Sequence, residues 1–274
     1  MKHVLTTGAD GMIGSYVDFG IRTTRDSLDV TDLDAVRAMC QLHKPRVIIH
    51  LAANTDLARC EKDPAHAYLV NTVGTYHMAL AARECGAKLV YVSTSGIFDG
   101  TKKEPYSESD TPSPLNHYGH SKYLGELAVR GALEDYLIVR VSWVFGGGVT
   151  RDKKFVGKIM HQLDKEAISV VSDKYGSPTY AKDAVMAIKH LMTEDKRGMY
   201  HMSNAGSASR LEIANEIVRI AKSSAKIIPV LSTDLASDYV SGTNESMSSK
   251  VSYMRPWQKA LGEYIETEWL DTIR

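Results

Sequence analysis

A glycine-rich turn near the N-terminus constrains the fold more than any other stretch of this sequence. The short apolar segment His3–Thr6 is typical of a buried strand, and Gly8, Gly11 and Gly14 follow it at intervals of three residues. Glycines at this spacing, where a strand turns into a helix, permit a tight turn and let backbone amides approach a phosphate closely. The pattern therefore predicts a parallel α/β sheet whose first turn binds the pyrophosphate of a dinucleotide.

The first crossover of this sheet is unusually short. Only five residues separate Gly14 from the next strand candidate, Gly20–Arg22. The end of the second strand normally selects the cofactor, with an acidic residue for a ribose hydroxyl and a basic residue for a 2′-phosphate. Because Arg22 and Arg25 lie there, the sequence favours NADPH over NADH. Asp26 keeps NADH open, and surface charge is an alternative interpretation of both arginines.

Strand and helix patterns alternate through the first half of the chain. We expect a helix over 33–43, an apolar strand over 46–51, a long helix over 64–85 and an apolar strand over 87–93. Uninterrupted apolar strands are typical of parallel sheets that are buried on both faces. Ligands of such sheets gather at the carboxyl ends of the strands. Thr94 ends one strand there, and the small residues Ala52 and Ala53 after the other leave room for a cofactor.

Tyr118 and Lys122 lie one helical turn apart, in a stretch over 114–126 that reads as a loop running into a helix. At this spacing both side chains leave the same helical face. A phenol with an ordinary pKa near ~10 transfers protons poorly at neutral pH, and an adjacent ammonium stabilises the phenolate and lowers that pKa. The pair is therefore a candidate general acid. A solvated helix face is the alternative, and the glycine turn and Thr94 favour the catalytic interpretation.

The last third of the chain is less regular. We expect helices over 154–163, 181–192 and 210–222, strands over 168–171 and 198–201, and a turn over 176–179. The segment 231–252 is rich in Ser, Thr, Asn and Asp, which predicts a mobile loop. The expected fold is α/β: a doubly wound parallel (Rossmann) sheet over 1–142 with a returning segment at about 181–202, and a smaller interleaved substrate-binding lobe over 143–180 and 203–274.

Composition excludes several classes of function. Lys plus Arg and Asp plus Glu both number 33, so neither nucleic acid nor an anionic membrane is an expected partner. No stretch approaches ~18 consecutive apolar residues and no signal peptide is recognisable, so we expect a soluble, cytoplasmic protein. Cys40, Cys60 and Cys85 lack metal-ligand spacing and are interpreted as reduced thiols. We expect no metal site.

Seven segments, taken in order, resemble the extended short-chain dehydrogenase/reductase family: TGADGMIG, LAAN, YVSTSGIFDG, YGHSKYLGE, RVSWVFGGG, DKYGSPTYAKD and MRPW. Within that family the chain looks like the branch of dTDP-4-dehydrorhamnose reductases, over nearly its whole length. The resemblance implies that Thr94 hydrogen-bonds the substrate carbonyl and that Tyr118 donates the proton. It implies for Lys122 that the ammonium lowers the tyrosine pKa and holds the nicotinamide ribose.

The resemblance also implies two sets of binding residues. The cofactor set, with the arginines argued above, comprises Gly8, Gly11, Met12, Ile13, Gly14, Arg22, Arg25, Asp29, Val30, Leu51, Ala52, Ala53, Tyr118 and Lys122. The substrate set comprises Thr94, Ser95, Trp143, Phe155 and Arg255, with Trp143 as an aromatic wall beside the sugar and Arg255 as a contact of the nucleotide diphosphate.

The chain departs from the branch after the fourth strand. The branch usually reads Ser-Thr-Asp-Tyr-Val-Phe where this chain has Ser-Thr-Ser-Gly-Ile-Phe over 93–98, so its sugar can differ. Related 4,6-dehydratases carry an acidic pair after the hydroxyl residue, and Ser95 with Gly96 cannot act in that way.

The leading hypothesis is an NAD(P)H-dependent reductase of the 4-keto group of a nucleotide-activated 6-deoxysugar. Alternatives are a nucleotide-sugar epimerase with tightly bound NAD and a non-catalytic NAD(P)-binding regulatory subunit, since fold does not fix function. The sequence names neither the sugar, the nucleotide nor the oligomeric state, for which a homodimer is one option.

Overall fold

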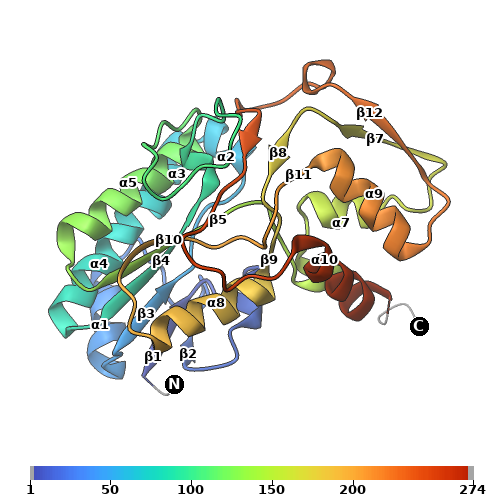
Figure 1. Ribbon diagram of the computed structural model, residues 1–274. Coiled ribbons are helices and arrows are strands. Elements are labelled where there is room, and N and C mark those ends of the chain that lie inside the picture. The colour runs from blue at the N-terminus through green and yellow to red at the C-terminus, as the bar shows by residue number, and fades with distance from the viewer. Residues whose placement is uncertain (1–2, 271–274) are drawn as a thin grey trace.

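The computed structural model describes residues 3–270, and a six-stranded sheet lies at its centre (Figure 1). Every neighbouring pair of strands in this sheet is parallel. The strand order is β10-β5-β4-β3-β1-β2, from Gly198–His201, Tyr136–Val141, Lys88–Thr94, Val47–His50, Val4–Thr7 and Ile21–Arg22. The chain steps outward from β1 to β2 and then returns past β1 to β3. This reversal makes the carboxyl edge between β1 and β3 the switch point, where open α/β sheets bind ligands.

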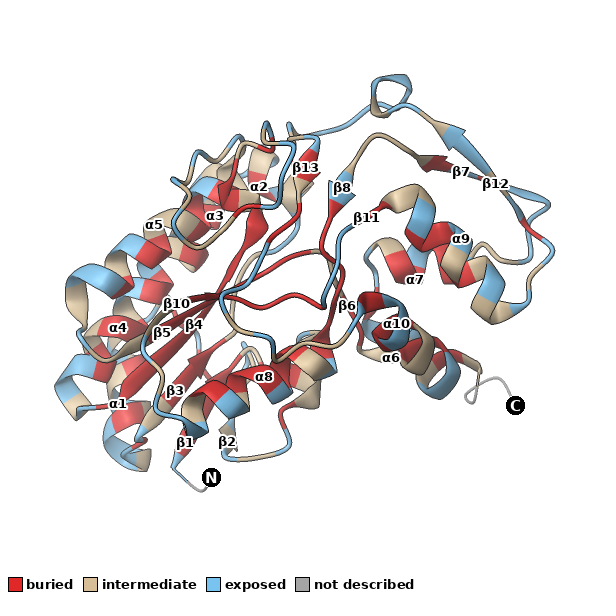
Figure 2. Ribbon diagram, in the orientation of Figure 1, coloured by how far each residue is buried: buried red, intermediate tan, exposed pale blue. Residues whose placement is uncertain are grey.

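Helices cover both faces of the sheet, as the doubly wound prediction requires. Helices α1 (Leu33–His43), α4 (Gly74–Cys85) and α5 (His117–Ala132) cover one face, and α8 (Ala181–Thr193) covers the other (Figure 1). Successive strand side chains point to opposite faces, so Leu5 packs toward α1 and α4 while its neighbour Val4 packs toward α8. Both faces are therefore buried, which explains the uninterrupted apolar strands (Figure 2).

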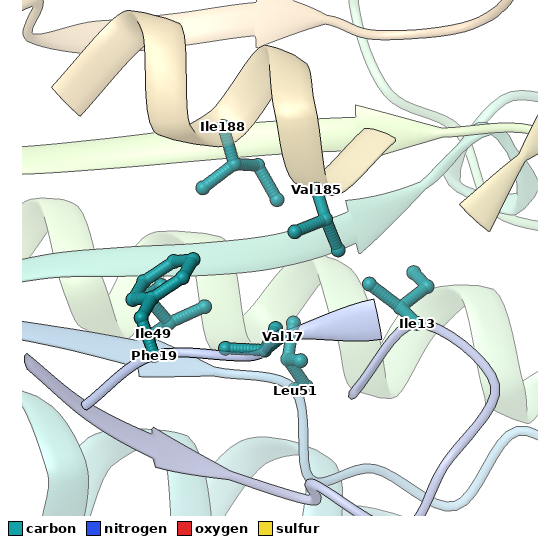
Figure 3. A pocket seen from close by; sticks show the side chains of 7 residues that line it. All are labelled: Ile13, Val17, Phe19, Ile49, Leu51, Val185 and Ile188. Carbon is teal, nitrogen blue, oxygen red and sulfur yellow. The ribbon is translucent and has the colours of Figure 1, made fainter. Parts of the chain in front are cut away.

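The first crossover is short, as predicted. Between β1 and β2 the chain makes one 3₁₀ turn, η1 (Gly14–Tyr16), in place of a longer helix. Apolar side chains of this segment, of β3 and of α8 face one another and close the sheet over the missing helix (Figure 3): Ile13, Val17, Phe19, Ile49, Leu51, Val185 and Ile188. The side chain of Ile13 thus packs against the core, so only its backbone can contact a ligand at the glycine turn.

A second set of elements builds a separate apolar core beside the sheet. Its helices are α6 (Gly148–Arg151), α7 (Phe155–Met160), α9 (Arg210–Ala221) and α10 (Trp257–Ile265), the last followed by a π-helical turn, η5 (Glu266–Leu270). Strand β7 (Ala167–Val171) pairs with β12 (Lys226–Val230), and β6 (Val144–Phe145) pairs with β9 (Thr179–Tyr180). The third small sheet joins β11 (Ala208–Ser209), β8 (Tyr175–Gly176) and β13 (Asn244–Glu245).

Several predicted elements are confirmed, and others require correction. Strand β10 returns to the main sheet beside β5, as expected for 198–201. The expected helix over 64–85 is continuous, but it divides into α3 (Pro64–Tyr68), a π turn η2 (Leu69–Val73) and α4. Helix α2 (Leu57–Lys62) was not predicted, the helix expected over 154–163 ends at Met160, and the ends of the expected turn over 176–179 lie in β8 and β9.

The segment 231–252, predicted to be a mobile loop, is not a loop throughout. The loop contains a 3₁₀ turn, η4 (Ser232–Asp234), and strand β13, where Asn244 is buried. The side-chain nitrogen of Asn244, Nδ2, donates to the backbone carbonyl oxygens of Lys102 and Lys103 at 2.9 and 3.0 Å. A segment rich in such polar residues looks like a loop in the sequence. Their hydrogen bonds to backbone groups nevertheless hold the segment against the rest of the protein. Within 3–270 no helix is long and apolar enough to span a membrane.

Candidate active site

The glycine turn lies against the end of the neighbouring strand at the carboxyl edge. Gly8 has φ +67°, and a Cβ atom added there would lie 2.7 Å from the amide nitrogen of Ala52. A Cβ on Gly14 would lie 2.3 Å from the carbonyl oxygen of Gly8, so the turn closes only with glycine at both positions. The structure therefore brings Gly8, Gly14 and Ala52 together at the switch point, with Leu51 and Ala53 flanking Ala52.

Two arginines border this turn from different elements. Arg22, at the end of β2, donates from Nη2 to the carbonyl oxygen of Ala9 at 3.2 Å. Arg151, at the end of α6, donates from Nε to the carbonyl oxygen of Asp10 at 3.2 Å. The short crossover therefore places Arg22 against the glycine turn, and α6 adds a second cation that the sequence analysis did not assign to the cofactor.

The expected adenine-side residues differ in exposure. Val30 is buried against α4, where its side chain lies close to Gly74. Asp29 is exposed, and hydrogen bonds from Thr31, with a smaller contribution from the charge of Arg25, lower its pKa. Asp29 and Arg25 are therefore both accessible to a ligand, unlike Val30.

The first turn of helix α5 packs closely against the segment after β4, and this packing places Tyr118 near Thr94. The Asn116 side chain caps the helix by accepting from the Gly119 amide at 2.8 Å. A Cβ on Gly119 would lie 2.0 Å from the carbonyl oxygen of Gly96, so only glycine allows this approach. The Tyr118 side chain is half-buried next to Thr94, because a Cβ atom added to Gly96 would lie 3.4 Å from Thr94 Oγ1 and 3.6 Å from Tyr118 Cε1. The Thr94 hydroxyl accepts from the Gly96 amide at 3.1 Å. The side chains of Tyr118 and Thr94 thus lie beside each other.

Lys122 lies one turn further along α5 and is buried. Its Nζ donates to the carbonyl oxygen of Val92 at 2.8 Å and lies 4.2 Å from the centre of the Tyr91 ring. Burial lowers the pKa of this ammonium to about 7, and the carboxylate of Glu126 opposes the shift only in part. Lys122 therefore titrates near neutral pH, far below an ordinary lysine.

The expected lowering of the Tyr118 pKa is not what the structure shows. Burial raises the pKa of this phenol to about 12, the Thr94 hydrogen bond opposes the shift, and the charge of Glu245 adds to it. Burial destabilises the phenolate by more than the hydrogen bond from Thr94 stabilises it. Tyr118 is therefore a fully protonated donor throughout the neutral range.

Asn71 supports the catalytic helix, a role that the sequence analysis did not give it. Its Oδ1 accepts from the Asn54 amide at 2.7 Å, and its Nδ2 donates to the Asn54 carbonyl and to Ser121 Oγ, both at 3.0 Å. Asn71 lies in the π turn η2, and such turns are frequent at functional sites. A single π turn leaves no periodicity in a sequence, so no pattern could have predicted it.

Four segments meet beside Thr94 to form the remaining wall of the site. Trp143 has φ +40°, and its indole nitrogen donates to Glu245 Oε2 at 3.1 Å. Ser95 Oγ donates to the same oxygen at 3.3 Å. The Arg210 guanidinium carbon lies 4.3 Å from the Trp143 ring centre and 4.8 Å from that of Phe155. The expected substrate residues Ser95, Trp143 and Phe155 are thus joined by Glu245 and Arg210, which the sequence analysis missed.

Arg255, expected to contact a diphosphate, is already bound within the protein. Its Nε and Nη2 donate to the two oxygens of Asp183 at 2.8 and 2.9 Å, and its Nη1 donates to Glu263 at 2.6 Å. Two carboxylates therefore neutralise the guanidinium and align it on α8 and α10. The Arg255 side chain remains 34% exposed within this network, and its expected contact with a diphosphate stays a prediction. Among residues 3–270 no group of three side chains is arranged to hold a metal ion.

A parallel sheet with a glycine turn at its switch point, and Thr94, Tyr118 and Lys122 at the same edge, defines a nucleotide-dependent oxidoreductase of the extended short-chain dehydrogenase/reductase class. The model of one family, the RmlD substrate binding domain, matches residues 1–269. The chain belongs to this family.

Similar proteins agree with this assignment. The spore coat polysaccharide biosynthesis protein SpsK of Bacillus subtilis is 33% identical, with 97% of this chain and 98% of the relative covered. A dTDP-4-keto-6-deoxy-D-glucose reductase of Streptomyces niveus is 36% identical over 79% of this chain and 77% of its own length. The crystal structure of dTDP-4-dehydrorhamnose reductase from Bacillus anthracis in complex with NADP superposes with a TM-score of 0.93, at 33% identity, over 97% of this chain and 100% of that one.

Proposed function

We propose that this protein reduces the 4-keto group of a nucleotide-activated 6-deoxysugar with NADPH. The observation that carries the proposal is the meeting of Tyr118 and Thr94 at the carboxyl edge, next to the glycine turn and Lys122. Reductases of this substrate type are among its relatives, and one similar structure is an NADP complex.

In this mechanism the glycine turn and Lys122 would hold the cofactor, which supplies the hydride to the carbonyl carbon. Thr94 and Tyr118 hold the carbonyl oxygen between their hydroxyl groups. Tyr118 keeps its proton because burial raises its pKa to about 12. As hydride arrives the oxygen becomes an alkoxide, which is a stronger base than a phenolate, so the proton moves from Tyr118 to the sugar.

We further propose that the cofactor is bound by 1–142 with 181–202, and the sugar nucleotide by 143–180 and 203–274. The separate apolar core beside the sheet supports this division, and so does the hydrogen-bonded link from Ser95 through Glu245 to Trp143. Arg22 and Arg25 would read the 2′-phosphate. A homodimer and a cytoplasmic location stay predictions.

The proposal is tested by NADPH oxidation in the presence of a panel of nucleotide-linked 4-keto-6-deoxysugars. We expect turnover with at least one member and purification without retained cofactor, because a reductase exchanges its cofactor at every cycle. Tightly retained NAD, with isomerisation of a nucleotide sugar and no net NADPH consumption, would assign the protein to the epimerases instead. The absence of both activities, with NADPH still bound, would favour the regulatory subunit.

A further inference from the structure

Strand β13 delivers a carboxylate to the wall of the site. Glu245 pairs with Gly176 of β8, and its backbone oxygen accepts from Ser142 Oγ at 3.2 Å, so the main chain is held from two sides. Its side-chain Oε2 accepts from both Ser95 Oγ and Trp143 Nε1. These two donors fix the direction of the carboxylate.

The second oxygen of this carboxylate, Oε1, has no hydrogen-bond partner among residues 3–270, and the side chain is only partly buried. The charge of Glu245 acts on two groups of the site, because it raises the pKa of the Tyr118 phenol and also opposes the lowering of the Arg210 pKa. Glu245 therefore lies between Ser95, the neighbour of Thr94, and Trp143, which stacks on Arg210, and it has one acceptor available. A carboxylate only accepts hydrogen bonds, so its ligand has to be a donor.

We propose that Glu245 is a specificity-determining residue that accepts a hydrogen bond from the hydroxyl group on the ring carbon next to the carbonyl. This inference rests on the proposed reductase function. Thr94 and Tyr118 hold the carbonyl oxygen, and Glu245 is joined to Ser95, the residue that follows Thr94. In a 4-keto-6-deoxyhexose the carbons beside the carbonyl are C3, which carries a hydroxyl, and C5, which carries the methyl group. The 3-hydroxyl is therefore the hydrogen-bond donor that the carbons beside the carbonyl offer to this carboxylate.

A cycle of two substrates and two proteins tests the proposal. The substrates are the nucleotide-linked 4-keto-6-deoxyhexose that the enzyme reduces and its 3-deoxy analogue, and the proteins are the wild type and Glu245→Ala. A charge-assisted hydrogen bond predicts that the wild type prefers the hydroxylated substrate by roughly 10- to 100-fold in kcat/KM. Glu245→Ala should reduce this preference to within about threefold, through a higher KM for the hydroxylated substrate.

Two further variants keep the test decisive. Glu245→Gln preserves the shape of the side chain and an acceptor for Trp143, so it carries the test if the alanine variant fails to fold. It should lose most of the preference because an amide is the weaker acceptor. Glu216→Ala is the control, since Glu216 pairs with Arg219 on the surface of α9 and should leave the preference unchanged.

A merely structural Glu245 would lower the melting temperature and kcat for both substrates alike while the preference persists, and that result would overturn the proposal. So would a wild type without preference. Calorimetric affinities for the two reduced products should show the same pattern as kcat/KM. Failure of the wild type to reduce either substrate would instead overturn the proposed function, which keeps the two failures distinct.

Discussion

Tyr118 and Lys122 share one helix face, and burial moves their pKa values in opposite directions because one group is charged when deprotonated and the other when protonated. With a pKa of about 12, the Tyr118 phenol is protonated at neutral pH and can donate its proton. We therefore expect Tyr118→Phe to keep the fold and the affinity for NADPH and to lower kcat by about 10²–10⁴, the usual worth of general acid catalysis. Steady-state kinetics with calorimetric cofactor binding is the measurement. A variant within threefold of the wild type would remove Tyr118 from the role of acid.

The lowered pKa of Lys122 leads us to expect proton uptake when the cofactor binds. Its pKa is about 7, so at pH 8 most of the side chain is neutral, and a polyanionic cofactor should raise that pKa. Binding then takes up protons, and the affinity for NADPH falls as pH rises from 7 toward the raised pKa. Calorimetry in two buffers of different ionisation enthalpy measures the uptake. Lys122→Met should lose it and also lose turnover and affinity. Equal uptake by that variant would place the titrating group elsewhere.

We also expect single residues to decide between NADPH and NADH. Each charge-assisted hydrogen bond to a 2′-phosphate contributes roughly 1.5–3 kcal/mol, so one contact can favour NADPH by tenfold or more. The bond from Arg22 to Ala9 places this guanidinium beside the glycine turn. Replacing Arg22 and Arg25 together by Ala should reduce kcat/KM for NADPH and leave NADH kinetics nearly unchanged. Arg130→Ala, at an exposed position on α5, is the control. Equal use of both cofactors by the wild type would contradict this reading of the arginines.

At the scale of elements, α5 is joined to β5 by an ion pair that water does not reach. Arg140 donates to both oxygens of Glu126 at 2.9 and 2.7 Å, and both residues are buried. Removing one partner leaves a buried charge uncompensated, so Glu126→Gln should cost about 3–5 kcal/mol in the free energy of unfolding. It should also lower the Lys122 pKa further, because Glu126 opposes the shift of that group.

A matched pair on the surface provides the comparison. Arg37 and Glu84 join α1 to α4 at 2.7 Å, with side chains 37% and 43% exposed. Glu84→Gln should change the free energy of unfolding far less than Glu126→Gln does, and this small effect should disappear at high salt. Urea unfolding of both variants measures the difference. A similar cost for the two substitutions would show that the buried pair does not stabilise the junction of α5 and β5.

The elements that were predicted correctly are those whose sequence signals lie within the element itself. Apolar runs and the 3.6-residue period locate β3, β4 and α1, and Asp32 caps α1 by accepting from the Ala35 amide at 3.0 Å. Glycine spacing locates the first turn. The site wall could not be predicted in this way, because Ser95 and Glu245 are 150 residues apart in sequence. The ion pair of Arg255 could not be predicted for the same reason, since its partner Asp183 lies 72 residues away.

At the scale of the whole molecule, the chain builds an apolar core beside the sheet and enters both this core and the sheet more than once. After β5 the chain leaves the sheet, returns through α8 and β10, and leaves again through β11 and α9 (Figure 1). The catalytic side chains come from the sheet domain, and Trp143, Arg210 and Glu245 come from segments beside it. Substrate reduction should therefore require both cores to be folded.

The transfer of hydride to the sugar is tested most directly by isotope labelling. The enzyme is incubated with a nucleotide-linked 4-keto-6-deoxysugar and NADPH deuterated at both C4 positions, and the product is examined by mass spectrometry and NMR. The account predicts one deuterium per product molecule, located on C4 of the sugar, and stoichiometric NADPH consumption. An isomerised sugar without deuterium, or consumption of NADPH without label in the sugar, would contradict it.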